Sequence, residues 1–143
     1  MTHSRHKARE AALQAIYWSE SSGDPIRETI TTMSLRAGLS TEAEAFSVTL
    51  CERTWERRDH LDSLIEGVSE NWALDRISRI DRILLHMALT EMQAFDDIPA
   101  KVSIDEAIEL AKEYSVERSP SFINGILDTL AKQEGMIERV GGD

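Results

Sequence analysis

The sequence predicts an all-α protein of about six or seven helices. Apolar residues recur at every third or fourth position along most of the 143-residue chain, which is the period of a helix with one buried face. The chain has only three prolines and seven glycines, and the prolines mostly stand where a helix would begin. These observations argue against an all-β fold, and no segment is expected to form a strand.

Two helices are expected before residue 40. The first covers residues 4 to about 21 and ends at a polar break in residues 22–25. Asp24 is expected to cap the second helix with Pro25 at its first position, and Gly38 is expected to end it. The apolar face of the first helix is formed by Ala8, Ala12 and Ile16, with Leu13 and Tyr17 beside them.

A capping box is expected to open the third helix, because Thr41 is followed three residues later by Glu44. We expect this helix to bend near residues 58–59, and a further helix with an apolar stripe to follow over about 61–68. A turn is expected at residues 71–75.

The C-terminal part of the chain is expected to hold three more helices. The first covers about residues 75–94 and is broken at residues 96–99. Two adjacent amphipathic helices follow. Ser119 and Pro120 predict an N-cap and a first-turn proline for the second of them.

The length predicts one domain over residues 1–143, built from two smaller halves. We place the N-terminal helical half at residues 1–72 and the C-terminal helical half at residues 73–134. Residues 135–143, which end in two glycines and an aspartate, are expected to be a frayed tail.

Charge is distributed unevenly along this acidic chain. The net charge of −10 argues against a dedicated nucleic-acid binder, because phosphate neutralisation needs clustered Lys and Arg. The first nine residues nevertheless hold no acidic residue, and we expect the first two turns of the helix to project beyond the core and expose their arginines. This basic head, a candidate phosphate-binding surface, consists of His3, Arg5, His6, Lys7 and Arg9.

Two further surfaces are candidates for binding. The loop over residues 115–121 offers small hydroxyls and one arginine, Arg118, at the start of a helix. Phe122 beside it is suited either to the core or to stacking on an unpaired nucleobase. The charged helix face near residue 80 is typical of a solvated surface or of a protein interface. The candidate partner-binding residues on this face are Asp75, Arg79, Asp81 and Arg82.

Catalytic and metal-binding patterns are not expected in this chain. His60 and His86 are isolated, no glycine-rich loop suits a phosphate, and no nucleophile motif is present. We therefore expect no enzyme, no cofactor and no metal. The single cysteine, Cys51, is interpreted as a buried inert thiol in a reducing compartment. With neither a signal peptide nor a membrane span expected, the prediction is a cytoplasmic protein.

Four ordered motifs resemble the NusB family of bacterial transcription antitermination factors. The resemblance extends over nearly the full length of the chain, and the two C-terminal motifs are long and correctly spaced. The matching segments are REAALQAIY at residues 9–17, ILLHMALTEM at 83–92, IPAKVSIDEAIELA at 98–111 and FINGILD at 122–128.

The resemblance implies an all-helical fold of two small packed bundles and binding of boxA-type single-stranded RNA, as in the leaders of ribosomal RNA operons. It implies two protein partners: NusE, a small-subunit ribosomal protein, and the RNA polymerase elongation complex with other Nus factors. It also implies a monomer or a homodimer. The RNA-binding positions that it implies are Arg5, His6, Lys7 and Arg9 with His3 upstream, Tyr17, and Arg118, Ser119 and Ser121 with Phe122. The acidic NusE-facing positions fall on Asp75 and Asp81.

An alternative remains open at this point. A module of the same fold could bind NusE or self-associate while having little affinity for RNA. Histidines dilute the basic head, and Ser121 stands where the family often has a basic residue.

Overall fold

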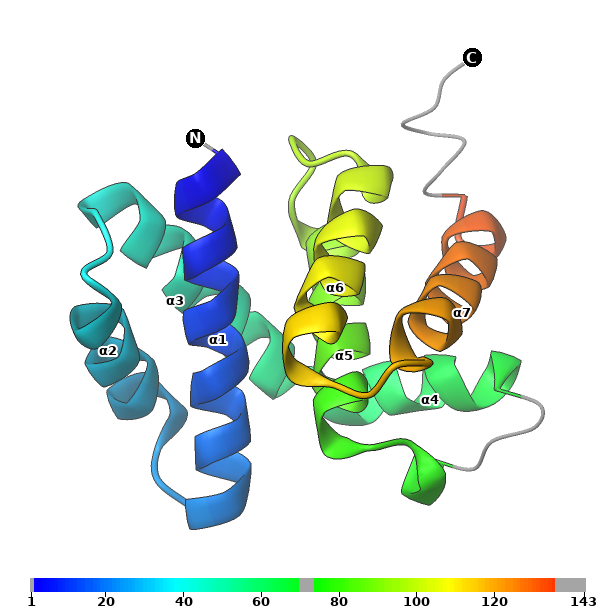
Figure 1. Ribbon diagram of the computed structural model, residues 1–143, viewed down its shortest axis with the longest axis horizontal. Coiled ribbons are helices and arrows are strands. Elements are labelled where there is room, and N and C mark those ends of the chain that lie inside the picture. The colour runs from blue at the N-terminus through cyan, green and yellow to red at the C-terminus, as the bar shows by residue number, and fades with distance from the viewer. Residues whose placement is uncertain (1, 70–73, 136–143) are drawn as a thin grey trace. The chain divides into compact units, whose positions relative to one another are not determined.

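The computed structural model describes the backbone of residues 2–69 and 74–135 and the side chains of residues 4–69 and 74–135 (Figure 1). Within these ranges it consists of helices and connecting loops, which confirms the predicted all-α class. The elements are α1 (Thr2–Ser22), α2 (Ile26–Ala37), α3 (Thr41–Glu56), α4 (Arg58–Val68), the 3₁₀ helix η1 (Leu74–Arg76), α5 (Arg79–Ala94), α6 (Ala100–Tyr114) and α7 (Ser119–Gln133).

Two compact units divide the chain, Met1–Arg57 and Arg58–Asp143. The first contains α1, α2 and α3, and the second contains α4 to α7. The boundary therefore comes at the end of α3, earlier than the expected division after residue 72. Helix α4 packs against α5 and α7, which explains why it belongs to the second unit. Of the expected frayed tail, residues 136–143 lie outside the described residues.

In the first unit, α1 packs against both α2 and α3 (Figure 1). Alanines on the buried face of α1 allow a close approach of the neighbouring helices, and the Ser47 hydroxyl of α3 donates a 2.7 Å hydrogen bond to the Ala8 carbonyl. The side chains of Ser19 and Thr29 join α1 to α2 at 2.8 Å. The fully buried large side chains of this unit are Ile16, Ile30 and Leu50.

The ends of α2 and α3 correct two expected caps. Pro25, rather than Asp24, occupies the N-cap position of α2, and the Asp24 carboxylate instead accepts a 2.8 Å hydrogen bond from the Trp18 indole. Ser40 caps α3, because its hydroxyl accepts from the Ala43 amide at 3.2 Å. Gly38 ends α2 with φ of 66°, a left-handed conformation that glycine adopts without strain and that confirms the predicted stop.

In the second unit, α5 is the central helix and contacts α4, α6 and α7. Every residue from 83 to 92 is buried, so this helix has no solvated face over most of its length. The helix expected from residue 75 is divided in two: η1 covers Leu74–Arg76, and α5 begins after Ser78, whose hydroxyl accepts from the Asp81 amide at 3.2 Å.

Helix α7 corrects a third expected cap. Arg118 occupies the N-cap position, and Ser119 is the first residue of the helix, with Pro120 at its first turn. The Ser119 hydroxyl is not directed to the backbone of its own helix. It donates to the carboxylate of Asp81 on α5 at 2.8 Å.

Cys51 is fully buried, which confirms the predicted structural thiol, and this burial raises the pKa of its sulfhydryl. None of the helices in residues 2–69 and 74–135 combines the length and the apolar character that crossing a bilayer requires.

Candidate nucleic-acid interface

The basic head lies on the first turns of α1, and its members differ in exposure. Lys7 is exposed, whereas Arg5 and His6 are half-buried. Arg9 is only 3 % exposed, so the expectation that this arginine projects into solvent is wrong. Helix α1 begins at Thr2, but the side chain of His3 lies outside the described residues.

Phe46 of α3 explains the burial of the arginines. The guanidinium carbons of Arg5 and Arg9 lie 4.3 Å and 5.3 Å from the centre of its ring. Such cation–π contacts orient a guanidinium while its aliphatic stem packs on the core. The role of Phe46 could not be predicted from the sequence, because helical spacing marks it only as an apolar residue and does not show which residue of another helix it meets.

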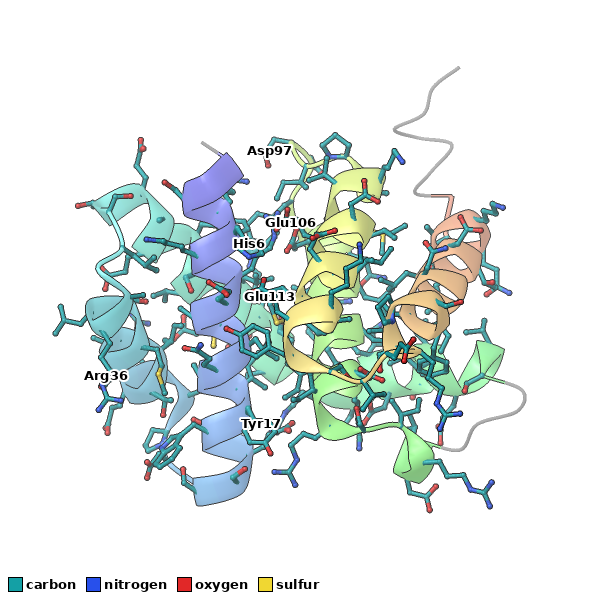
Figure 2. All side chains as sticks on the ribbon, viewed as in Figure 1. His6, Tyr17, Arg36, Asp97, Glu106 and Glu113 are labelled. Carbon is teal, nitrogen blue, oxygen red and sulfur yellow. The ribbon has the colours of Figure 1, made fainter. Side chains whose placement is uncertain are left out.

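Other side chains on α1 are accessible. His6 lies near the start of the helix and Tyr17 toward its end (Figure 2). The nearest imidazole nitrogen of His6 is 4.0 Å from the carboxylate of Glu10, one turn later. Tyr17 is 43 % exposed, and its neighbour Trp18 is 52 % exposed. A phenol and an indole at these exposures offer flat faces to a partner.

In the second unit, the α6–α7 connection borders an open groove of about 150 Å³. Arg118 and Ser121 are exposed beside it, and Phe122 is half-buried, so the ring is accessible although it belongs to the apolar stripe of α7. The groove brings together residues from η1, the start of α5 and the start of α7. Its lining consists of Arg76, Ile77, Ser78, Asp81, Val116, Arg118, Ser119 and Phe122.

Asp81 lines this groove, but its side chain is buried and does not present an exposed charge. It is 6 % exposed, and its two carboxylate oxygens accept hydrogen bonds from Ser115 at 2.7 Å and from Ser119 at 2.8 Å. The two serine hydroxyls are themselves 2.9 Å apart. Ser119 is 2 % exposed, so its side chain faces Asp81 and not the solvent.

The charged face near residue 80 therefore divides into two pairs. Asp75 and Arg79 are exposed, as a partner-binding role requires. Asp81 is bound to the serines, and Arg82 is half-buried and bound to Asp62 of α4. Alternating charge in the sequence did not distinguish the exposed pair from the internally bonded pair.

Asp62 is the centre of a second polar cluster in this unit. Its carboxylate accepts from the Arg82 guanidinium, at 3.0 Å from Nε, and lies 2.7 Å from Nε2 of the buried His86. Partial burial raises the pKa of this carboxyl group, but the hydrogen bonds and charges of Arg82 and His86 outweigh that effect, and its pKa is lowered overall. The cluster fastens α4 to α5.

Comparison with known proteins agrees with the fold and the motifs. A family model described as the NusB family matches residues 6–132. The transcription antitermination protein NusB of Syntrophus aciditrophicus is 44% identical over 126 residues, which cover 88% of this chain and 78% of that protein.

Solved structures show the same architecture. A structure of T. maritima NusB has a TM-score of 0.85 and 33% sequence identity and covers 94% of this chain and 96% of its own. A structure of the antitermination factors NusB and NusE in complex with dsRNA has a TM-score of 0.82, with 93% of this chain and 99% of that chain covered; at 21% identity, it supports the fold alone. This chain belongs to the NusB family.

Proposed function

We propose that this protein is a transcription antitermination factor that binds boxA-type RNA together with NusE and links both to elongating RNA polymerase. The observation that supports it most is the family match over residues 6–132, which includes most of the basic head and the whole α6–α7 connection. The protein acts in this proposal as a non-catalytic adaptor on nascent RNA in the cytoplasm. The basic head of the first unit and the groove of the second unit each offer contacts for a polymer.

The proposed RNA contacts have two chemical kinds. The cations of α1 serve the phosphates: Lys7 is exposed, and Arg5 is held over Phe46 with part of its side chain accessible. The groove beside α7 serves the bases, because Phe122 offers a ring for stacking and Arg118 a planar guanidinium. His3, His6, Tyr17 and Ser121 remain proposed RNA-binding positions.

Of the four candidate residues on the charged face near residue 80, only the exposed pair is proposed to contact NusE. Asp75 and Arg79 are accessible and present opposite charges to a partner. Asp81 and Arg82 act within the second unit, where their side chains bond to residues of neighbouring elements. We therefore assign these two residues a supporting role for the surface rather than direct contact.

A titration of fluorescein-labelled RNA tests the proposal. The probes are a boxA-type single strand and a scrambled strand of equal length, each measured by anisotropy at two salt concentrations. We expect the boxA-type strand to bind more tightly at both, with affinity falling steeply as salt increases because phosphate contacts release counterions. Equal binding of the two strands, or no binding at low salt, would contradict RNA recognition and favour the interaction-module alternative.

A further inference from the structure

We propose that Asp81 is a positioning residue, whose buried carboxylate holds the α6–α7 loop in the conformation that binds RNA. This inference rests on the proposed function. The observation behind it is that one carboxylate bonds to both ends of the loop: Ser115 follows the last residue of α6, and Ser119 is the first residue of α7.

The location of Asp81 makes it a rigid point of attachment. It lies in the first turn of α5, and its amide donates to the Ser78 hydroxyl at 3.2 Å. The start of a helix favours a negative charge, so the carboxylate is stabilised there even though it is 6 % exposed. Helix α5 is the most buried helix of its unit, so the loop is tied to the central helix of that unit's core.

The contact uses both oxygens of the carboxylate. Each serine hydroxyl donates to a different oxygen, at 2.7 Å and 2.8 Å, so both acceptors are used. An asparagine offers only one oxygen and presents an NH₂ group at the second position. Substitution would therefore replace one accepting oxygen with a donor, so that the serine facing it has to turn its hydroxyl, and would remove the charge at the start of α5.

The residues that we assign to RNA lie on either side of the second serine, Ser119. Arg118 directly precedes Ser119, and Phe122 follows one turn into α7, with its amide bonded to the Arg118 carbonyl at 3.2 Å. Both side chains line the same groove as Asp81. A loop released from Asp81 would sample several arrangements of Arg118 and Phe122, and RNA binding would have to overcome the entropy of ordering them.

The test compares three variants: Asp81→Asn, the double change Ser115→Ala with Ser119→Ala, and Ser103→Ala as the matched control. Ser103 is also buried and donates to a carboxylate of α5, that of Glu91 at 2.9 Å, but it lies in the first turn of α6, well before the loop. The control thus removes the same kind of bond from the same unit while leaving the loop contact intact.

Two readouts are taken: hydrogen exchange in the peptide covering residues 115–122, and anisotropy with the fluorescein-labelled boxA-type RNA. For Asp81→Asn and for the double serine variant we expect faster exchange in that peptide and a Kd raised by about 3- to 10-fold, in line with the loss of one or two hydrogen bonds. The salt dependence of binding should stay unchanged, because neither Asp81 nor the serines neutralise phosphate. Ser103→Ala should change neither readout.

Each outcome decides a separate point. Unchanged exchange in both loop variants overturns the positioning role, and so does faster exchange with an unchanged Kd. An equal rise in Kd for Ser103→Ala shows a general loss of stability and also overturns it. If Asp81→Asn loses its helical circular dichroism, the double serine variant decides. Absence of RNA binding by the unmodified protein contradicts the proposed function, and with it the RNA-binding part of this inference, while exchange still reports whether Asp81 orders the loop.

Discussion

At the residue scale, two charged side chains of the basic head play different parts. Lys7 is exposed, whereas Arg9 is buried against Phe46 and contributes packing through its aliphatic stem. The sequence predicts a cluster of cations in this segment, but a helical wheel of α1 alone contains no information about a ring on α3. The exposure of each cation could therefore be determined only from the structure.

Replacing each residue by alanine should separate these parts. Lys7→Ala should weaken RNA binding and reduce the salt slope by about one, as the loss of one phosphate contact predicts, with stability unchanged within about 0.5 kcal/mol. Arg9→Ala should lower the free energy of unfolding by about 1–3 kcal/mol, because it removes a buried stem and a cation–π contact. Urea unfolding and RNA titration at two salt concentrations measure both. An Arg9→Ala protein as stable as Lys7→Ala would contradict the burial of Arg9.

The Asp62 cluster gives a prediction about pH. The pKa of Asp62 is lower in the folded protein, so its ionised form stabilises the fold above the unfolded-state pKa of about 3.9, and this contribution is lost as the pH falls through the lowered folded value. Asp62→Asn should cost about 1–3 kcal/mol at pH 7, because Arg82 and buried His86 lose a charged acceptor.

Urea unfolding between pH 7 and pH 3 checks this prediction: the difference between the two proteins should shrink below about pH 4. The matched control is Asp105→Asn, which removes an exposed carboxylate 3.8 Å from Lys101 and should change stability by less than about 0.5 kcal/mol. A cost for Asp62→Asn that stays constant down to pH 3 would show that the charge of Asp62 is not what stabilises the cluster.

At the element scale, the sequence predicts the existence of the helices better than their first residues. Gly38 ends α2 as predicted, because a left-handed C-cap depends on one local residue type. Three N-caps were assigned to the wrong residue, at α2, α3 and α7. At α3 two adjacent hydroxyl residues, Ser40 and Thr41, compete for the same role, and at α2 the Asp24 carboxylate accepts from the Trp18 indole instead. At α7 a tertiary contact competes with capping, because the Ser119 hydroxyl bonds to Asp81, which is distant in the sequence.

The start of α3 offers a direct test of this competition. Ser40→Ala should destabilise the protein by about 1 kcal/mol, because its hydroxyl satisfies the Ala43 amide at the helix start. Thr41→Ala, one residue later and inside the helix, should cost less than about 0.5 kcal/mol because threonine has a lower helix propensity than alanine. The midpoints of thermal or urea unfolding measure both, and the reverse order would show that Thr41 is the cap.

At the scale of the whole molecule, the chain combines a net charge of −10 with a basic head at one end of α1. The fold class and the family could be predicted from the sequence, because helical periodicity and the four motifs lie within continuous segments of the chain. The candidate groove could not be assembled in the same way, since Arg76, Asp81 and Phe122 come from three elements, and only packing brings them together.

The net negative charge of the chain limits how tightly RNA binds without a partner, because long-range repulsion between the acidic side chains and the RNA phosphates opposes the contacts of the basic head. A second component that brings its own cations should therefore strengthen RNA binding. Anisotropy with labelled boxA-type RNA at two salt concentrations, with and without purified NusE, measures RNA binding and the contribution of NusE in one experiment. We expect salt-sensitive binding that tightens when NusE is present. A stable complex with NusE that binds no RNA at either salt concentration would contradict this expectation.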